Sequence, residues 1–136
     1  MNTLKQDYAG LVYQKIITYK GNHPEKSSDR KEYSSMAFRL PVLVKKVGLV
    51  QAIAFLLDQK KDPHQQLLTD FTKVVMGEEG TPHAFLERVC HAGYKDYQLL
   101  TTKSSLALGW FKRYAQSVLK YRPGSDEIEE VSNDPV

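Results

Sequence analysis

Apolar residues recur at steps of three and four along most of the chain, which is the spacing of one face of an α-helix. The first such stripe predicts a helix over residues 3–20, which Gly21 and Pro24 end. Its members are Leu4, Tyr8, Leu11, Val12, Ile16 and Tyr19. The stretch over residues 25–32 is too polar to pack, and we expect a solvated helix start or a mobile loop there.

A second stripe begins at Tyr33 and keeps its helical phase across Pro41. Proline kinks a helix, and the unbroken phase therefore predicts one kinked helix rather than two helices with unrelated faces. Gly48 ends this helix, and a new stripe starts directly after it. That stripe predicts a third helix, which ends in Lys60 and Lys61.

The second half of the chain is also helical in pattern. We predict helices over roughly residues 64–76 and 84–90, and a short helix or an extended turn over residues 94–100. Thr101 or Thr102 is then expected to cap the last helix. This last stripe is the strongest in the chain and comprises Leu106, Ala107, Trp110, Phe111, Tyr114, Ala115 and Val118.

No alternating run of β-branched residues bounded by turn residues occurs in the sequence. The predicted fold class is therefore all-α, a compact bundle of about six helices with a kinked second helix. A length of 136 residues with 41% hydrophobic residues fits one domain, which we assign to residues 1–122. Residues 123–136 form an acidic tail, which we expect to be disordered because it has too little apolar surface to bury.

Charge is distributed unevenly between the predicted domain and the tail. Because the tail contributes −5 to the formal net charge of +3, residues 1–122 carry +8. A body with this charge is attracted to polyanions, above all to phosphate backbones. Solvated lysines on helix faces would give the same balance, so the charge alone leaves both interpretations open.

Cysteine content and hydropathy point to a reducing, cytoplasmic setting. Cys90 is the one cysteine, which excludes an intramolecular disulfide and a CxxC zinc site, and we expect it to be a small core residue. The first residues lack a basic stretch followed by an apolar run, and no window approaches 18 consecutive apolar residues. Secretion and a membrane-bound state are therefore disfavoured.

Candidate catalytic groups do not form a recognisable constellation. Neither GxxxxGK[ST] nor GxGxxG occurs. His83, Glu87 and His91 share one helical face, but the two histidines are eight residues apart, which does not fit the HExxH zinc motif. We interpret these three residues as an exposed polar face and predict no catalytic residue, no metal and no cofactor.

Basic residues on helices are the remaining candidates for function. The predicted RNA-binding set is Arg39, Lys45, Lys46, Lys60, Lys61, Lys112 and Arg113. The lysine pairs at 45–46 and 60–61 are expected at helix C-termini, where cations offset the helix dipole without any ligand. Arg39, Lys112 and Arg113 have no such explanation and are the stronger candidates for phosphate contact. Aromatic residues near them fall on apolar stripes and are interpreted as core.

Three segments in this order resemble the small all-helical subunit of the type III-B CRISPR effector, the Cmr complex. They are YSSMAFRLPVLVKKVG from Tyr33, GLVQAIAFL from Gly48 and WFKRYA from Trp110, and the resemblance spans roughly residues 8–120. Tyr97, followed by a threonine and then the tryptophan helix, also fits this family. Two features depart from it. After the threonine the family tends to have an acidic residue and a small apolar run, whereas this chain has Lys-Ser-Ser at 103–105, and the acidic tail is not part of the family pattern.

The resemblance implies a non-catalytic, RNA-binding structural subunit in antiviral defence. Its copies would stack into a short filament and line the path of single-stranded target RNA, while other subunits cut. The implied partners are other Cmr subunits, neighbouring copies of itself, crRNA and target RNA. Two alternatives stay open: the small helical subunit of the related type III-A complex, and a helical protein-interaction adaptor whose basic faces are merely solvated.

Overall fold

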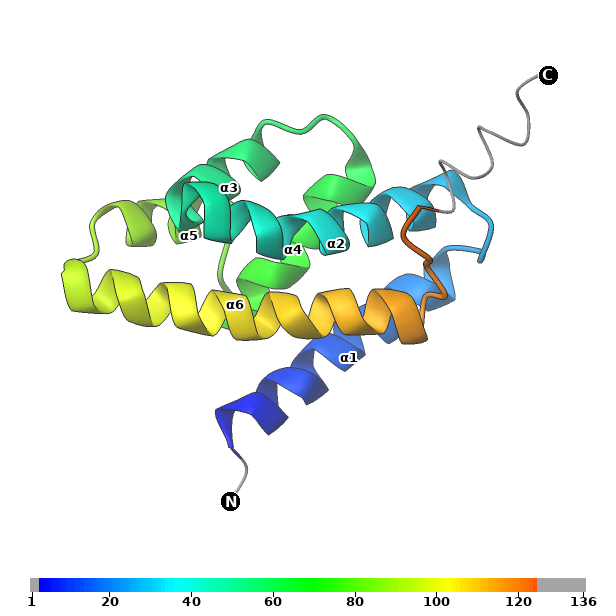
Figure 1. Ribbon diagram of the computed structural model, residues 1–136, viewed down its shortest axis with the longest axis horizontal. Helices are drawn as coiled ribbons and strands as arrows, with labels where there is room; N and C mark the ends of the chain where they lie inside the picture. The colour runs from blue at the N-terminus through cyan, green and yellow to red at the C-terminus, as the bar shows by residue number, and fades with distance from the viewer. Residues whose placement is uncertain (1–2, 125–136) are drawn as a thin grey trace.

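The computed structural model describes residues 3–124, which form six helices and no strand (Figure 1). The helices are α1 (Leu4–Asn22), α2 (Ser28–Val47), α3 (Leu49–Leu57), α4 (Asp62–Met76), α5 (Pro82–Cys90) and α6 (Tyr94–Ser117). The all-α prediction with about six helices is confirmed. Residues 125–136 of the predicted tail lie outside the described residues.

Hydroxyl side chains fix the starts of three helices. Thr3 and Gln6 form a reciprocal capping box at α1, in which each side chain bonds the other residue's backbone amide. Ser27 caps α2 by accepting from the Arg30 amide, and Thr81 caps α5 by accepting from the Ala84 amide. These local signals explain why the helices begin where they do.

The helix start expected over residues 25–32 is present and mostly exposed or half-buried, but it is not solvated throughout, because Arg30 is buried. The helix begins at Ser28, and Arg30 in its first turn is only 4% exposed. The Arg30 guanidinium donates hydrogen bonds to the carbonyl oxygens of Leu119, at 2.9 and 3.2 Å, and of His23, at 3.4 Å. The two bonds to Leu119 join residues 89 positions apart in the sequence. Together the three bonds satisfy a charged side chain that would otherwise be expected in solvent.

The last helix is continuous, so the predicted break before Thr101 was wrong. α6 runs over 24 residues, and both Thr101 and Thr102 lie inside it. Its buried stripe starts at Leu100 and continues through Ser104 to Ala107 without a change of phase. At 1.5 Å per residue, α6 is about 36 Å long and can contact several other helices at once.

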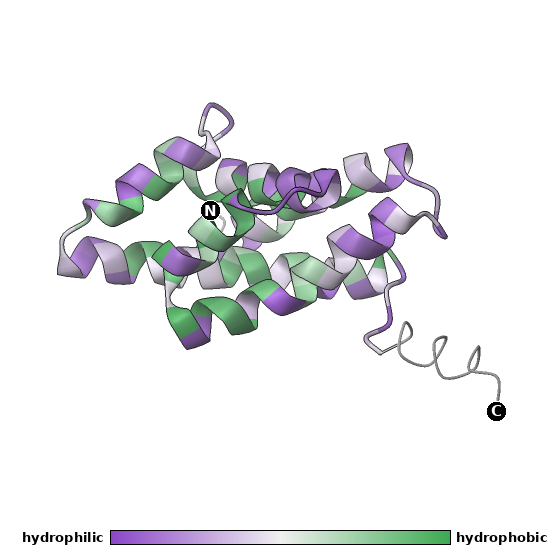
Figure 2. Ribbon diagram, turned by 90° about the horizontal axis from the view of Figure 1, so that it is seen from above, coloured by the Kyte–Doolittle hydropathy of each residue, from purple (hydrophilic) through white to green (hydrophobic). Residues whose placement is uncertain are grey.

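α6 and α2 lie side by side, and α1 crosses α6 (Figure 1). α2 runs through Pro41 without interruption, as its unbroken phase predicts. Figure 2 shows hydrophobic and hydrophilic stretches alternating along most helices, which is the amphipathic pattern of a bundle. The largest fully buried side chains include Tyr33, Phe71, Phe85 and Phe111, from four different helices.

Cys90 is exposed, so the expectation that it is a core residue was wrong. On the short helix α5 the inward positions belong to Phe85 and Val89, both essentially fully buried. The neighbour of Val89 is turned about 100° away from it and faces solvent. None of the described helices is both long and apolar enough to cross a bilayer.

We expect Gly48→Ala to destabilise the fold more than Gly77→Ala. Both glycines end a helix at positive φ, +91° and +101°, where a Cβ is strained by about 1–3 kcal/mol. At Gly48 a Cβ would also meet the Tyr97 hydroxyl at 3.3 Å, whereas space is open at Gly77. That hydroxyl accepts a hydrogen bond from the Leu49 amide.

Chemical denaturation of the two variants measures this difference. A smaller loss for Gly48→Ala than for Gly77→Ala would show that the Tyr97 contact does not hold the turn between α2 and α3.

Candidate nucleic-acid interface

All seven predicted RNA-binding residues are exposed, and they lie in three places on the surface. One group follows the outer side of α2, a second lies in the connection between α3 and α4, and the third is on α6. Exposure agrees with the helical phase of their segments for the five that lie in helices, which are Arg39, Lys45, Lys46, Lys112 and Arg113. The structure decides which of these residues are neighbours.

Along α2, a row of charged residues at steps of seven runs down one face of the helix. Glu32, Arg39 and Lys46 occupy this row. Glu32 forms an ion pair with Lys61 at 3.1 Å, and a second one with the His64 ring at 3.2 Å when that ring is protonated. The row is therefore compensated at its start and carries uncompensated positive charge toward its end.

Lys60 and Lys61 do not lie at a helix C-terminus, which corrects their predicted location. α3 ends at Leu57, and Lys61 is the residue that precedes α4, where the helix dipole is positive. α3 ends early because the Gln65 side chain donates to the carbonyl oxygen of Leu56 at 2.9 Å and so satisfies the helix end. The dipole explanation thus holds for Lys45 and Lys46 alone, which lie in the last turn of α2.

Lys112 and Arg113 are adjacent in sequence but lie beside different helices. The Lys112 ammonium is 5.5 Å from the centre of the Phe38 ring of α2, a cation–π contact. Arg113 instead lines a hollow of about 480 Å³ together with Lys5 of α1 and Trp110. A single RNA contact site that uses both side chains would have to cross α6.

His64 is a buried group that the sequence did not single out as functional. Its side chain is 5% exposed, and burial lowers its pKa, which the positive charges of Lys61 and Arg39 lower further and Glu32 opposes. The influence of both Arg39 and Lys61 on this ring places the two cations in one electrostatic neighbourhood. Arg39 belongs to the α2 row and Lys61 to the connection before α4, so His64 lies near both groups of cations.

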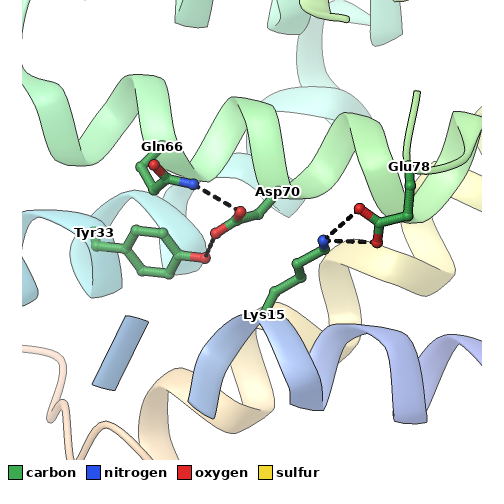
Figure 3. A network of polar contacts seen from close by, with 5 residues as sticks. All are labelled: Lys15, Tyr33, Gln66, Asp70 and Glu78. Carbon is green, nitrogen blue, oxygen red and sulfur yellow. Dashed lines mark hydrogen bonds and ion pairs between the residues drawn. The ribbon is translucent and has the colours of Figure 1, made fainter. Parts of the chain in front are cut away.

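A buried polar network joins α2 to α4, and an exposed ion pair lies close to it (Figure 3). The Tyr33 hydroxyl donates to Asp70 at 2.7 Å, and Gln66 donates to the other carboxylate oxygen at 2.9 Å. Burial raises the pKa of Asp70 and, together with the Asp70 charge, that of Tyr33. Lys15 of α1 pairs with Glu78 at 2.8 Å on the surface.

Sequence reasoning missed the role of Asp70. The available signal was its position: Asp70 interrupts the apolar stripe of α4 between Leu67 and Phe71, and it is 6% exposed. A carboxyl group there needs hydrogen-bond donors from a neighbouring helix. Such a donor cannot be identified before the packing of α2 against α4 is known.

His83 lies in the first turn of α5, and His91 is the residue that follows the helix. His83, Glu87 and His91 are all exposed, and the intervening Arg88 pairs with Asp96 of α6. Within residues 3–124, no group of three His, Cys, Asp or Glu side chains is arranged to hold a metal ion.

Comparison with known proteins places this arrangement of helices in a family. The sequence matches the family described as CRISPR-associated protein (Cas_Cmr5) over residues 4–118, which include all six helices in full and all seven basic candidates. The chain belongs to the Cmr5 family. The resemblance to the small Cmr subunit is confirmed.

A curated sequence and a solved structure match this chain over nearly the whole of their own length. The CRISPR system Cmr subunit Cmr5 of Thermus thermophilus is 34% identical over 120 residues, which cover 88% of this chain and 99% of that protein. The X-ray crystal structure of a CRISPR-associated Cmr5 family protein from the same organism superposes with a TM-score of 0.77 at 34% identity. That superposition covers 87% of this chain and 98% of the other. The fold described above is therefore the Cmr5 fold.

Proposed function

We propose that this Cmr5-family protein is a non-catalytic subunit of a type III-B CRISPR (Cmr) complex that holds the backbone of crRNA and single-stranded target RNA. One observation carries the RNA-binding part. All seven basic candidates are exposed, and within residues 3–124 only Lys61 of the seven is paired with a carboxylate. Unpaired surface cations can replace the counterions of phosphates, which favours binding without sequence readout.

Guide pairing would supply sequence specificity, and this subunit would recognise only charge and backbone shape. A lone copy then binds RNA weakly, because it offers few phosphate contacts. Repetition of copies along one strand raises the affinity through effective concentration. This division of roles needs no catalytic group in this chain.

Contacts with other Cmr subunits and with neighbouring copies of this chain are part of the proposal. Exposed large apolar side chains support it, because a partner can cover them. They are Leu4, Leu11, Tyr13, Ile17, Val42, Val47, Tyr94 and Leu99. Tyr94 is 78% exposed at the start of α6, far from the Lys112 side chain near its end, so protein and RNA contacts can use different parts of one helix.

The proposed function is tested by reconstituting the Cmr complex with and without this chain. We expect the complex that contains it to bind target RNA more tightly and with a steeper dependence on salt, at an unchanged rate of RNA cleavage per bound RNA. Equal affinity and equal salt dependence in the two preparations would contradict the RNA-backbone role. Cleavage of labelled RNA by this chain alone would contradict the non-catalytic role.

The adaptor alternative predicts a different result in the same preparation. If the basic faces are only solvated, the chain stays bound to its protein partners after ribonuclease treatment and in high salt, and its removal leaves RNA affinity unchanged.

A further inference from the structure

A concave basic site lies at the start of α2, apart from the seven candidates discussed above. It is a cavity of about 400 Å³ between the first turns of α2 and residues 119–122. Its lining includes Lys26, Arg30, Lys31, Lys120 and Arg122, and among residues 3–124 Glu25 is the one carboxylate that lines it. The wall formed by residues 119–122 lies beyond residue 118, where the family match ends.

Arg30 brings a buried positive charge to this cavity. Its guanidinium makes three hydrogen bonds, all to carbonyl oxygens of Leu119 and His23, and within residues 3–124 it has no carboxylate partner. A guanidinium has five donors, so two remain for another acceptor. A buried, uncompensated guanidinium with two spare donors is suited to an oxyanion, above all to phosphate.

Ser34 supplies a second polar group at the same place. It is 1% exposed, it lines the cavity, and its hydroxyl has no hydrogen-bond partner within the described part of the chain. Buried hydroxyls are almost always paired in folded proteins. A phosphate oxygen in the cavity would supply the missing partner. The amino-terminal end of α2 adds a favourable dipole for an anion there.

The far wall of the cavity is held in a defined shape. Lys120 has φ +63°, a left-handed conformation that non-glycine residues adopt infrequently. The Tyr121 amide donates to the Ala115 carbonyl oxygen at 2.9 Å, which closes the turn after α6. Lys120 and Arg122 are thus carried by a fixed turn at the edge of the cavity.

An aromatic contact joins this wall to the predicted RNA face. The rings of Tyr121 and Phe38 lie 5.1 Å apart, and the Lys112 ammonium lies over the same Phe38 ring. From Arg30 to Lys46 the axis of α2 rises about 24 Å. At about 100° per residue, Arg39 and Lys46 point about 160–180° away from Arg30 around α2, so the cavity and the α2 row lie on different sides of the helix. Lys112 is the predicted RNA-binding residue linked to the cavity wall.

We infer that this cavity binds a backbone phosphate of single-stranded RNA and anchors one end of the strand on α2. The identity of the RNA rests on the proposed function, whereas the recognition of phosphate rests on Arg30, Ser34 and the basic rim. The cavity binds one phosphate group of the strand.

The test compares two matched pairs of exposed lysines in the full chain. Lys26→Gln with Lys120→Gln removes two charges from the cavity, and Lys20→Gln with Lys95→Gln removes two charges outside it. The probe is a labelled single-stranded RNA without a terminal phosphate, titrated at several salt concentrations. All variants keep the acidic residues 126–134, so their contribution is common to every measurement.

We expect the cavity pair to lower RNA affinity by roughly fourfold at 0.15 M salt and to reduce the salt slope by about 0.7, since the cavity contacts one phosphate and each single-strand phosphate contact contributes about 0.7. The control pair should change affinity by less than about 1.5-fold and leave the salt slope unchanged. Ser34→Ala should also weaken binding, without loss of thermal stability, because it removes only an unpaired hydroxyl. Equal losses for the two lysine pairs would overturn the inference, as would unchanged RNA affinity in Ser34→Ala.

Inorganic phosphate separates failure of this inference from failure of the proposed function. NMR resonances of Arg30 and Ser34 should shift on addition of phosphate and of the RNA probe alike. Shifts with phosphate but not with RNA would overturn the assignment to RNA and leave a site for free phosphate. If RNA binds through Arg39 and Lys112 and neither ligand shifts Arg30 or Ser34, the cavity inference fails and the proposed function stands.

Discussion

Asp70→Ala is expected to lower the free energy of unfolding by about 2–4 kcal/mol. The fully buried Tyr33 hydroxyl, 2.7 Å from the carboxylate, would lose its acceptor, and an unpaired buried hydroxyl costs about 1–3 kcal/mol. Gln66 would lose its partner too, and the space of the carboxyl group would stay unfilled. Relief of the buried charge offsets part of this loss.

This loss should increase as the pH falls from 7 toward 4. Burial raises the pKa of Asp70 above its value in the unfolded chain, so the folded protein binds the proton more readily. The stability that Asp70 contributes is therefore greatest below the unfolded pKa and decreases as the pH rises through the folded pKa. Asp70→Asn keeps an acceptor for Tyr33 without the charge. Its free energy of unfolding, relative to that of the parent protein, should therefore be highest near pH 7.

Urea denaturation at several pH values measures both effects. Glu78→Gln is the matched control, because it removes a carboxylate from the exposed Lys15 pair of the same region and should have a much smaller effect. An Asp70→Ala variant as stable as the control, or a loss that shrinks on acidification, would contradict this account of the network.

Removal of the α2 and α6 cations is expected to have the largest effect on RNA binding. With Arg39, Lys46, Lys112 and Arg113 all changed to glutamine, the salt slope of target-RNA binding should fall by about 2.8 for each copy in the assembled complex. At 0.15 M salt this corresponds to a loss of affinity on the order of 100-fold per copy. The reason is that four exposed side chains without carboxylate partners among residues 3–124 would no longer replace phosphate counterions.

The contribution of the two α6 cations can be measured separately. Lys112→Ala with Arg113→Ala should reduce the slope by about 1.4 and leave thermal stability nearly unchanged, apart from about 0.5–1 kcal/mol for the cation–π contact with Phe38. Lys20→Gln with Lys95→Gln is again the control for a general loss of charge. An unchanged salt slope in the Lys112 and Arg113 variant would refute a phosphate role for these two residues.

Much of the fold could be predicted because most of its determinants are local. Helical phase across Pro41 gave a continuous α2, and Gly48 separated α2 from α3. The errors arose where a distant partner decides the outcome. Arg30 is buried because carbonyl oxygens at residues 23 and 119 accept from it, and Thr101 is helical because the buried stripe of α6 continues through it.

The candidate site was predictable in composition but not in arrangement. Phase within a helix identifies an exposed cation such as Arg39, since the opposite face is apolar. It does not say which helices are neighbours, so neither the pairing of Lys61 with Glu32 nor the position of Lys112 over Phe38 could be anticipated. Contacts of these kinds depend on packing between elements far apart in the sequence.

Purification of the tagged chain from its native cells, with mass spectrometry of the bound proteins and sequencing of the bound RNA, tests the central claim most directly. We expect other Cmr subunits together with repeat-derived guide RNA, and loss of the RNA in high salt before loss of the proteins. Recovery of unrelated proteins without RNA would contradict the assignment to a Cmr complex and the RNA-binding role of the basic surface.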